Sequence, residues 1–139
     1  MLALEIFLNG RKVVLAGADD LSVLTGIVSA VGKLGRKTSG TKANKKGYDL
    51  WLTVGGLTGR IDGTPDEHLR WVGRKRLKIG DRVDIRVRKV AVADFPVESS
   101  PAASVKQERL QYKLVKAQYM KLRKKYEKPR ANKLAKRTQ

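Results

Sequence analysis

The dipeptide Asn9-Gly10 restricts the fold of this chain more than any other feature. It lies between two runs, 2–8 and 11–16, that are rich in apolar residues and suited to strands. A two-residue hairpin turn needs positive φ at both central positions, which Asn and Gly tolerate best. The sequence therefore predicts a β-hairpin over the first 16 residues of the chain.

The segment that follows the hairpin has apolar residues at intervals of three and four, which is typical of a helix with one buried face. We expect this helix from about residue 20 to residue 34, with an aspartate as its N-cap. Strands are predicted over 48–54 and 82–92, and 68–72 fits either a short strand or a helical turn. The apolar residues of the expected helix are Leu21, Leu24, Ile27, Val28 and Val31.

The composition changes near residue 97. Phe95 to Pro101 is predicted to be a linker, and 103–128 contains good helix formers with neither Gly nor Pro. Pro129 would end that helix, because proline cannot continue one. The sequence thus divides into a small domain, 1–97, and a linker with a basic helical extension, 98–139.

The order of these elements predicts an α+β fold. A small mixed sheet is opened by a β-hairpin, one helix packs on it, and a long basic C-terminal helix follows. Hairpin, helix and further strands are also the element order of a β-grasp domain. A small roll, or a barrel-like sheet with one helix, fits this order almost as well, and none of these folds implies a function.

Positive charge is the strongest indication of function. The chain has 31 Lys and Arg against 13 Asp and Glu, a net charge of +18. Such an excess repels itself, so a polyanionic partner is expected, and nucleic acid is the first candidate. The excess is +8 over residues 1–97 and +10 over residues 98–139, so the extension is the more densely charged part.

Three groups of basic residues are candidates for contacts with a phosphate backbone: the loop 35–47, the segment 70–89 and the C-terminal extension. The planar guanidinium of arginine suits phosphate. On the strand 82–92 the arginines share one face, which fits either a phosphate-binding row or a solvated sheet face that Asp84 neutralises. The candidate contacts are Arg36, Lys37, Lys42, Lys45, Lys46, Arg74, Lys75, Arg76, Arg86, Arg88, Lys113, Lys116, Arg123, Lys124 and Lys125.

The extension also carries a stripe of apolar and aromatic residues at spacings of three and four. Packing against a partner helix or against the domain explains such a stripe better than stacking on bases does. A second apolar line, formed by Leu110, Leu114 and Ala117, lies on the opposite side of the helix and suggests assembly into a complex. The packing stripe is Tyr112, Val115, Tyr119, Leu122 and Tyr126.

No catalytic or cofactor motif is recognisable. The chain has no cysteine, and its one histidine, His68, has no clustered second ligand, so no metal site is expected. The run 35–42 resembles a P-loop only in its glycines, because Thr41 precedes Lys42 where a P-loop has the reverse order. We therefore expect neither an enzyme nor a cofactor, and we expect the two tryptophans to be packing residues.

The sequence contains neither a membrane-spanning stretch nor a signal peptide pattern, and a cytoplasmic protein is expected. The first interpretation is a non-catalytic nucleic-acid-binding module. RNA or a ribonucleoprotein is favoured over a specific DNA sequence, because no base-reading motif is present. The alternative is an interaction or assembly module whose tyrosine-striped helix docks on an acidic partner or on its own copy.

Overall fold

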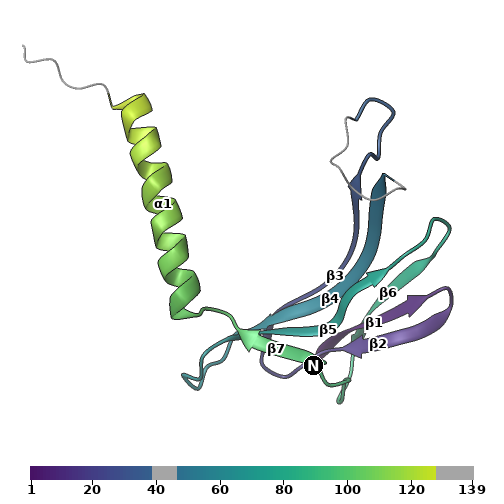
Figure 1. The fold of residues 1–139 in the computed structure, drawn as a ribbon. Coiled ribbons are helices and arrows are strands. Elements are labelled where there is room, and N and C mark those ends of the chain that lie inside the picture. The colour runs from purple at the N-terminus through teal and green to yellow at the C-terminus, as the bar shows by residue number, and fades with distance from the viewer. Residues whose placement is uncertain (39–46, 128–139) are drawn as a thin grey trace, which may run out of the picture. The chain divides into compact units, whose positions relative to one another are not determined.

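The computed structural model of the chain describes residues 1–38 and 47–127. The chain forms two compact units, Met1–Ala102 and Ala103–Gln139. Within the described residues, the first unit holds seven strands in two sheets and the second holds one helix (Figure 1). The fold is therefore α+β, as predicted, and most of its regular structure is strand.

The strands form two sheets in which every neighbouring pair is antiparallel. The sequence predicts a single mixed sheet, so this part of the prediction is wrong. The first sheet consists, in order, of β2 (Arg11–Ala16), β1 (Leu2–Leu8) and β6 (Val83–Lys89). The second consists, in order, of β3 (Leu21–Gly32), β4 (Tyr48–Thr58), β5 (Glu67–Arg76) and β7 (Glu98–Pro101).

The two sheets pack face to face around one hydrophobic core. Burial of apolar surface at this interface provides the main driving force for folding of the first unit. The buried side chains are Ile6, Val14 and Ala16 from the first sheet and Leu52, Val54, Leu69 and Trp71 from the second.

The hairpin at Asn9-Gly10 is confirmed. The φ angles are 51° at Asn9 and 79° at Gly10, so both residues adopt the left-handed conformation that the turn requires. Strands β1 and β2 pair from Leu8 opposite Arg11 to Leu4 opposite Ala16, with one irregularity between Ile6 and Phe7. The local turn chemistry therefore predicted this element correctly.

The helix expected over residues 20–34 is wrong, because this segment is strand β3. It pairs with β4 along its length, from Leu21 opposite Thr58 to Gly32 opposite Tyr48. Its β-branched residues favour an extended backbone. At Gly26 the strand lies against the first sheet, since a Cβ there would be 3.2 Å from Ile85 Cδ1. Without a helix after the first hairpin, the β-grasp order is not the order of this fold.

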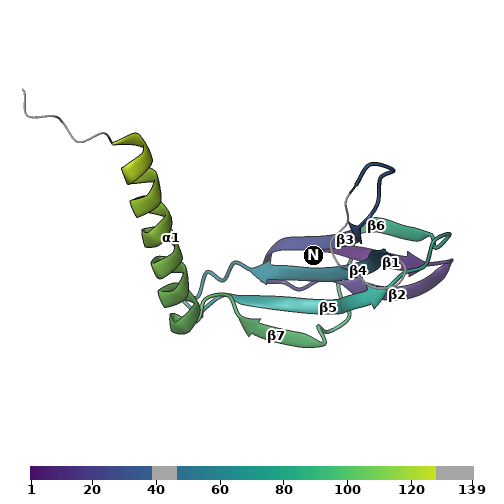
Figure 2. The ribbon, with the colours of Figure 1, turned by 45° about the horizontal axis from the view of Figure 1, so that its top comes forward.

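Several other segments differ from the expected boundaries. The ambiguous segment around His68 is strand β5, and Glu98–Pro101, expected to be linker, is strand β7 at the edge of the second sheet (Figure 2). The last long strand is shorter than expected, since β6 ends at Lys89. Short edge strands such as β7 are hard to find in a sequence because four residues carry little periodicity.

The second unit contains helix α1 (Val105–Tyr126), 22 residues long. Ser104 caps its N-terminus by accepting a hydrogen bond of 3.1 Å from the backbone N–H of Gln107. Three basic residues lie in its last turn, where they interact favourably with the helix dipole. None of the residues of α1 is buried.

Candidate nucleic-acid interface

The antiparallel strands bring three connections to the same end of the first unit. These are the β1–β2 turn, the β3–β4 connection and the β5–β6 turn, and we call this the hairpin end. The backbone N–H of Asn9 donates to the carbonyl of Arg82 at 2.8 Å, and that of Leu77 donates to the carbonyl of Leu50 at 3.0 Å. These bonds join the β5–β6 turn to the β1–β2 turn and to the first residues of β4.

Asp81 fastens two of these turns together. Its carboxylate accepts a hydrogen bond of 2.9 Å from the side-chain amide of Asn9 and one of 2.7 Å from the backbone N–H of Lys78. Hydrogen bonds to a carboxylate favour its charged form. The bond from Asn9 and the bond from Lys78, in that order, lower the pKa of Asp81 below its ordinary value.

Basic residues are concentrated at the hairpin end. Because the strands fix which residues lie at each end, the charges of the described part can be assigned directly. The basic residues at the hairpin end are Arg11, Lys12, Lys33, Arg36, Lys37, Arg74, Lys75, Arg76, Lys78 and Arg82, and the acidic ones are Asp49, Asp81 and Asp84. The end therefore carries a large positive excess.

The opposite end of the first unit has the reverse balance. There Arg60 is held by two carboxylates, Asp20 at 2.9 Å and Glu67 at 2.8 Å. The acidic residues at this end are Asp19, Asp20, Asp62, Asp66, Glu67, Asp94 and Glu98, and the basic ones are Arg60, Arg70, Arg88 and Lys89. A polyanion would therefore be attracted to the hairpin end and repelled from this one.

The structure brings together part of the basic surface that the sequence indicates. Arg36 and Lys37 are exposed beyond the end of β3, and Arg74, Lys75 and Arg76 are exposed at the end of β5. No ion pair joins any of these five to another described residue. The remaining loop candidates, Lys42, Lys45 and Lys46, lie outside the described residues.

The arginines of β6 are partly neutralised. Arg88 forms an ion pair of 2.7 Å with Glu5, a residue that is only 7% exposed, and Arg82, which directly precedes the strand, forms one of 3.1 Å with Asp84. Arg86 instead covers the ring of Phe7, at 4.5 Å from its centroid. Asp84 was expected in this role and Glu5 was not. The sequence signal that would have indicated it is that Glu5 shares its strand face with two apolar residues, Ala3 and Phe7.

The packing stripe occupies one side of helix α1, and no basic residue lies within it. At about 100° per residue, the packing stripe covers an arc of about 80°. Its predicted members are exposed, Tyr112 by 66%, Tyr119 by 56% and Tyr126 by 70%. The candidate contacts Lys113, Lys116, Arg123, Lys124 and Lys125 all lie outside that arc.

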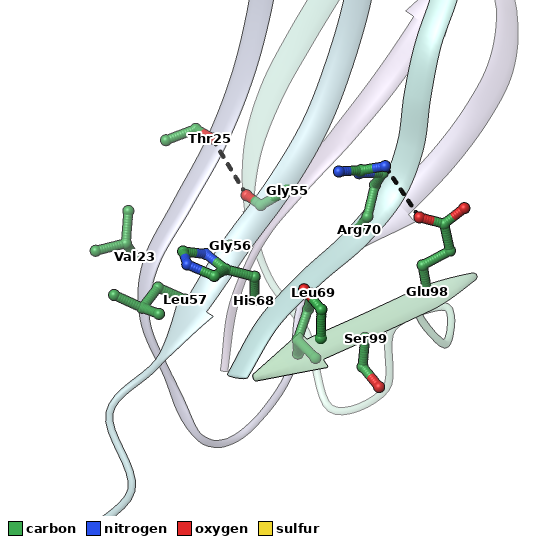
Figure 3. A pocket seen from close by; sticks show the side chains of 11 residues that line it. Val23, Thr25, Gly55, Gly56, Leu57, His68, Leu69, Arg70, Glu98 and Ser99 are labelled. Carbon is green, nitrogen blue, oxygen red and sulfur yellow. Dashed lines mark hydrogen bonds and ion pairs between the residues drawn. The ribbon is translucent and has the colours of Figure 1, made fainter. Parts of the chain in front are cut away.

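The outer face of the second sheet carries three adjoining hollows, which the sequence did not predict. The largest has a volume of about 430 Å³ and lies over β3, β4, β5 and the edge strand β7 (Figure 3). His68 and Arg70 line it, and Arg70 is paired with Glu98 at 2.9 Å. Thr25 spans β3 and β4 by donating to the carbonyl of Gly55 at 3.3 Å.

Comparison with known proteins gives no information on what this surface binds. No protein-family model, curated protein or solved structure matches the chain. In the described residues, no group of three or more His, Asp or Glu side chains could hold a metal ion. Nor is any described helix both long enough and apolar enough to cross a membrane. The candidate site is therefore defined by its own charge and geometry.

Proposed function

We propose that this protein is a non-catalytic nucleic-acid-binding module. It contacts the phosphate backbone with the basic residues of the hairpin end and with the basic side of α1. The observation that carries this proposal is the sorting of charge in the first unit. Basic residues gather at one end, and Arg74, Lys75 and Arg76 have no ion-pair partner among the described residues.

The chemistry of the surface favours backbone contacts over base reading. Lysine and arginine side chains bind phosphates largely by releasing condensed counterions, so the affinity falls steeply as salt is added. The described residues contain one helix, α1, and therefore no helix-turn-helix pair; the sequence has no cysteine, a single histidine and no RNP motif, so a zinc finger and an RNP-type site are not expected. Structured RNA or a ribonucleoprotein in the cytoplasm is therefore the proposed setting.

The test is to measure binding of the full chain to duplex DNA, structured RNA and single strands across a salt series. Bound nucleic acid is first removed during purification. Lys75→Gln at the hairpin end is compared with Lys89→Gln at the opposite end, because both are exposed lysines on strands. For duplex DNA, we expect Lys75→Gln to lower the slope of log affinity against log salt by about 0.9, and Lys89→Gln to leave it unchanged.

The proposal fails if none of the three ligands binds with a salt-dependent affinity. It also fails if the two lysine substitutions have equal effects, because the sorting of charge between the two ends would then have no bearing on binding.

A second candidate function is supported by a different observation. Helix α1 has no buried residue, and its tyrosine stripe is exposed along the whole helix. An acidic partner helix or another copy of this chain would cover such a stripe. Arg109, Lys116 and Arg123 lie directly beside it, so an acidic partner fits better than an antiparallel copy, in which these cations would face one another. Sedimentation equilibrium of the full chain separates the two, since only self-association gives a dimer.

A further inference from the structure

The hollows on the outer face of the second sheet adjoin one another in a row along β4, and we call this row the groove. The largest shares Thr25, Gly55 and Arg70 with a second hollow of about 380 Å³. The second shares Trp51 and Arg74 with a third of about 150 Å³. Along β4 the groove runs from Leu57 to Asp49, which is about 26 Å at about 3.3 Å per residue. It is therefore longer than one nucleotide.

Trp51 and Arg74 form a stack at the point where the second and third hollows meet. The guanidinium carbon of Arg74 lies 4.1 Å from the centroid of the indole ring. Arg74 is exposed and lines both hollows, so its planar group borders the groove. An arginine plane supported by an aromatic ring is a surface on which a nucleobase can stack.

The backbone of Arg74 is unusual in a way that supports a function for this stack. Its φ angle is +27°, in the left-handed region that residues other than glycine seldom adopt. The pairing of β4 with β5 also shifts register on either side of Val54, next to this point. Irregular pairing of this kind re-aims side chains and is common beside binding sites.

The remaining residues of the groove suit a polyanion at one end only. Arg70 is paired with Glu98 in the largest hollow, so that part is close to electrical balance. Arg74 and Arg76 line the smallest hollow together with one acid, Asp49, so two cations face one carboxylate there. Gly55 has no side chain that could fill the middle of the groove. A Cβ there would lie 3.1 Å from the carbonyl oxygen of Leu69.

We infer that this groove binds an unpaired segment of nucleic acid, with one base stacked on the Arg74 guanidinium above Trp51 and a phosphate at Arg76. The inference rests on the proposed function and narrows its ligand to single strands. In a duplex the faces of the bases are covered by their neighbours, so only an unpaired base can use a stacking surface. Duplexes would bind the protein through phosphate contacts at the hairpin end, Arg74 and Arg76 included, but would place no base in the groove.

Tryptophan fluorescence of the full chain tests this directly. The chain has two tryptophans, and Trp71 is only 4% exposed, with its indole N–H donating to the carbonyl of Asp94 at 2.7 Å. A change on binding therefore reports on Trp51. The probes are an oligouridylate of about ten nucleotides, an RNA duplex of the same length and a polyglutamate peptide. We expect quenching with the oligouridylate alone.

Two substitutions test whether the stack contributes to the affinity for the oligouridylate. Trp51→Leu removes the support of the stack and should weaken oligouridylate binding roughly fivefold to 150-fold, with duplex binding unchanged. Arg74→Lys keeps the charge but removes the plane, and should weaken the same ligand in the same selective way. Lys89→Arg is the control, because Lys89 lies at the opposite end of the unit, lines none of the three hollows and keeps its charge.

The outcomes separate this inference from the function it narrows. If single strands and duplexes bind alike and neither Trp51→Leu nor Arg74→Lys changes the ratio, the groove is not the site, although the protein still binds nucleic acid. If polyglutamate quenches Trp51 as strongly as the oligouridylate does, the groove takes an acidic peptide and the inference is wrong. If no nucleic acid binds at all, both the proposed function and the inference about the groove are wrong.

Discussion

The buried carboxylate of Glu5 neutralises part of the positive charge of the first sheet. It lies 2.7 Å from Arg88 and 3.8 Å from Lys12. Glu5→Gln keeps the shape but removes the negative charge, so we expect the free energy of unfolding to fall by about 1–3 kcal/mol. Urea unfolding at pH 7 measures the loss.

Glu98→Gln is the control for Glu5. Its ion pair with Arg70 is nearly as short, at 2.9 Å, but the two side chains are 64% and 58% exposed. An exposed pair contributes about 0–1 kcal/mol, so the loss should be smaller than for Glu5→Gln. Equal losses for the two variants would show that burial does not strengthen the Glu5 pair.

The lowered pKa of Asp81 predicts that the stability of the fold depends on pH. Since folding lowers its pKa, the carboxylate stabilises the fold above the unfolded value of about 3.9, and that stabilisation disappears as the pH falls through the folded pKa. Asp81→Asn should therefore lower the melting temperature at pH 7, and the difference from the native chain should shrink below about pH 4. Asp19→Asn, an exposed carboxylate at the opposite end, should show no such convergence.

At the scale of single elements, the sequence predicted what depends on local chemistry. The Asn9-Gly10 turn was predicted correctly, and a helix does lie within the expected segment 103–128, because turn angles and helix propensity depend on adjacent residues. Strand β3 was misread because its apolar residues satisfy helical spacing. What decides its conformation is pairing with β4, a partner that local periodicity cannot show.

Gly56 tests how closely β3 and β4 approach. A Cβ at this position would lie 2.6 Å from the carbonyl oxygen of Val23 and 2.8 Å from Leu21 Cδ2. Gly56→Ala therefore forces the strands apart and should cost about 1–3 kcal/mol in chemical denaturation. Gly73→Ala on β5 would meet only the flexible side chain of Arg70, at 3.2 Å, and should change stability by no more than about 0.5 kcal/mol. A neutral Gly56→Ala would contradict the observed pairing.

The candidate site belongs to the scale of the whole molecule, and there the sequence was least informative. It identified the basic residues but not which of them are neutralised, because Glu5 and Arg88 are 83 positions apart in the chain. The sorting of charge between two ends follows from the direction of every strand, β3 included. The groove was missed for the same reason, since Trp51 and Arg74 meet only after β4 and β5 have paired.

Removing residues 103–139 tests how the two units share stability and binding. The core lies within Met1–Ala102 and α1 contributes no buried residue, so we expect the fragment to unfold cooperatively with a free energy within about 0.5 kcal/mol of the full chain. Its charge falls from +18 to +7, because the removed part has 13 basic and 2 acidic residues. Affinity for RNA and its salt slope should both decrease. Binding should nevertheless persist, because the hairpin end is intact, and its complete loss would place the interface on the extension alone.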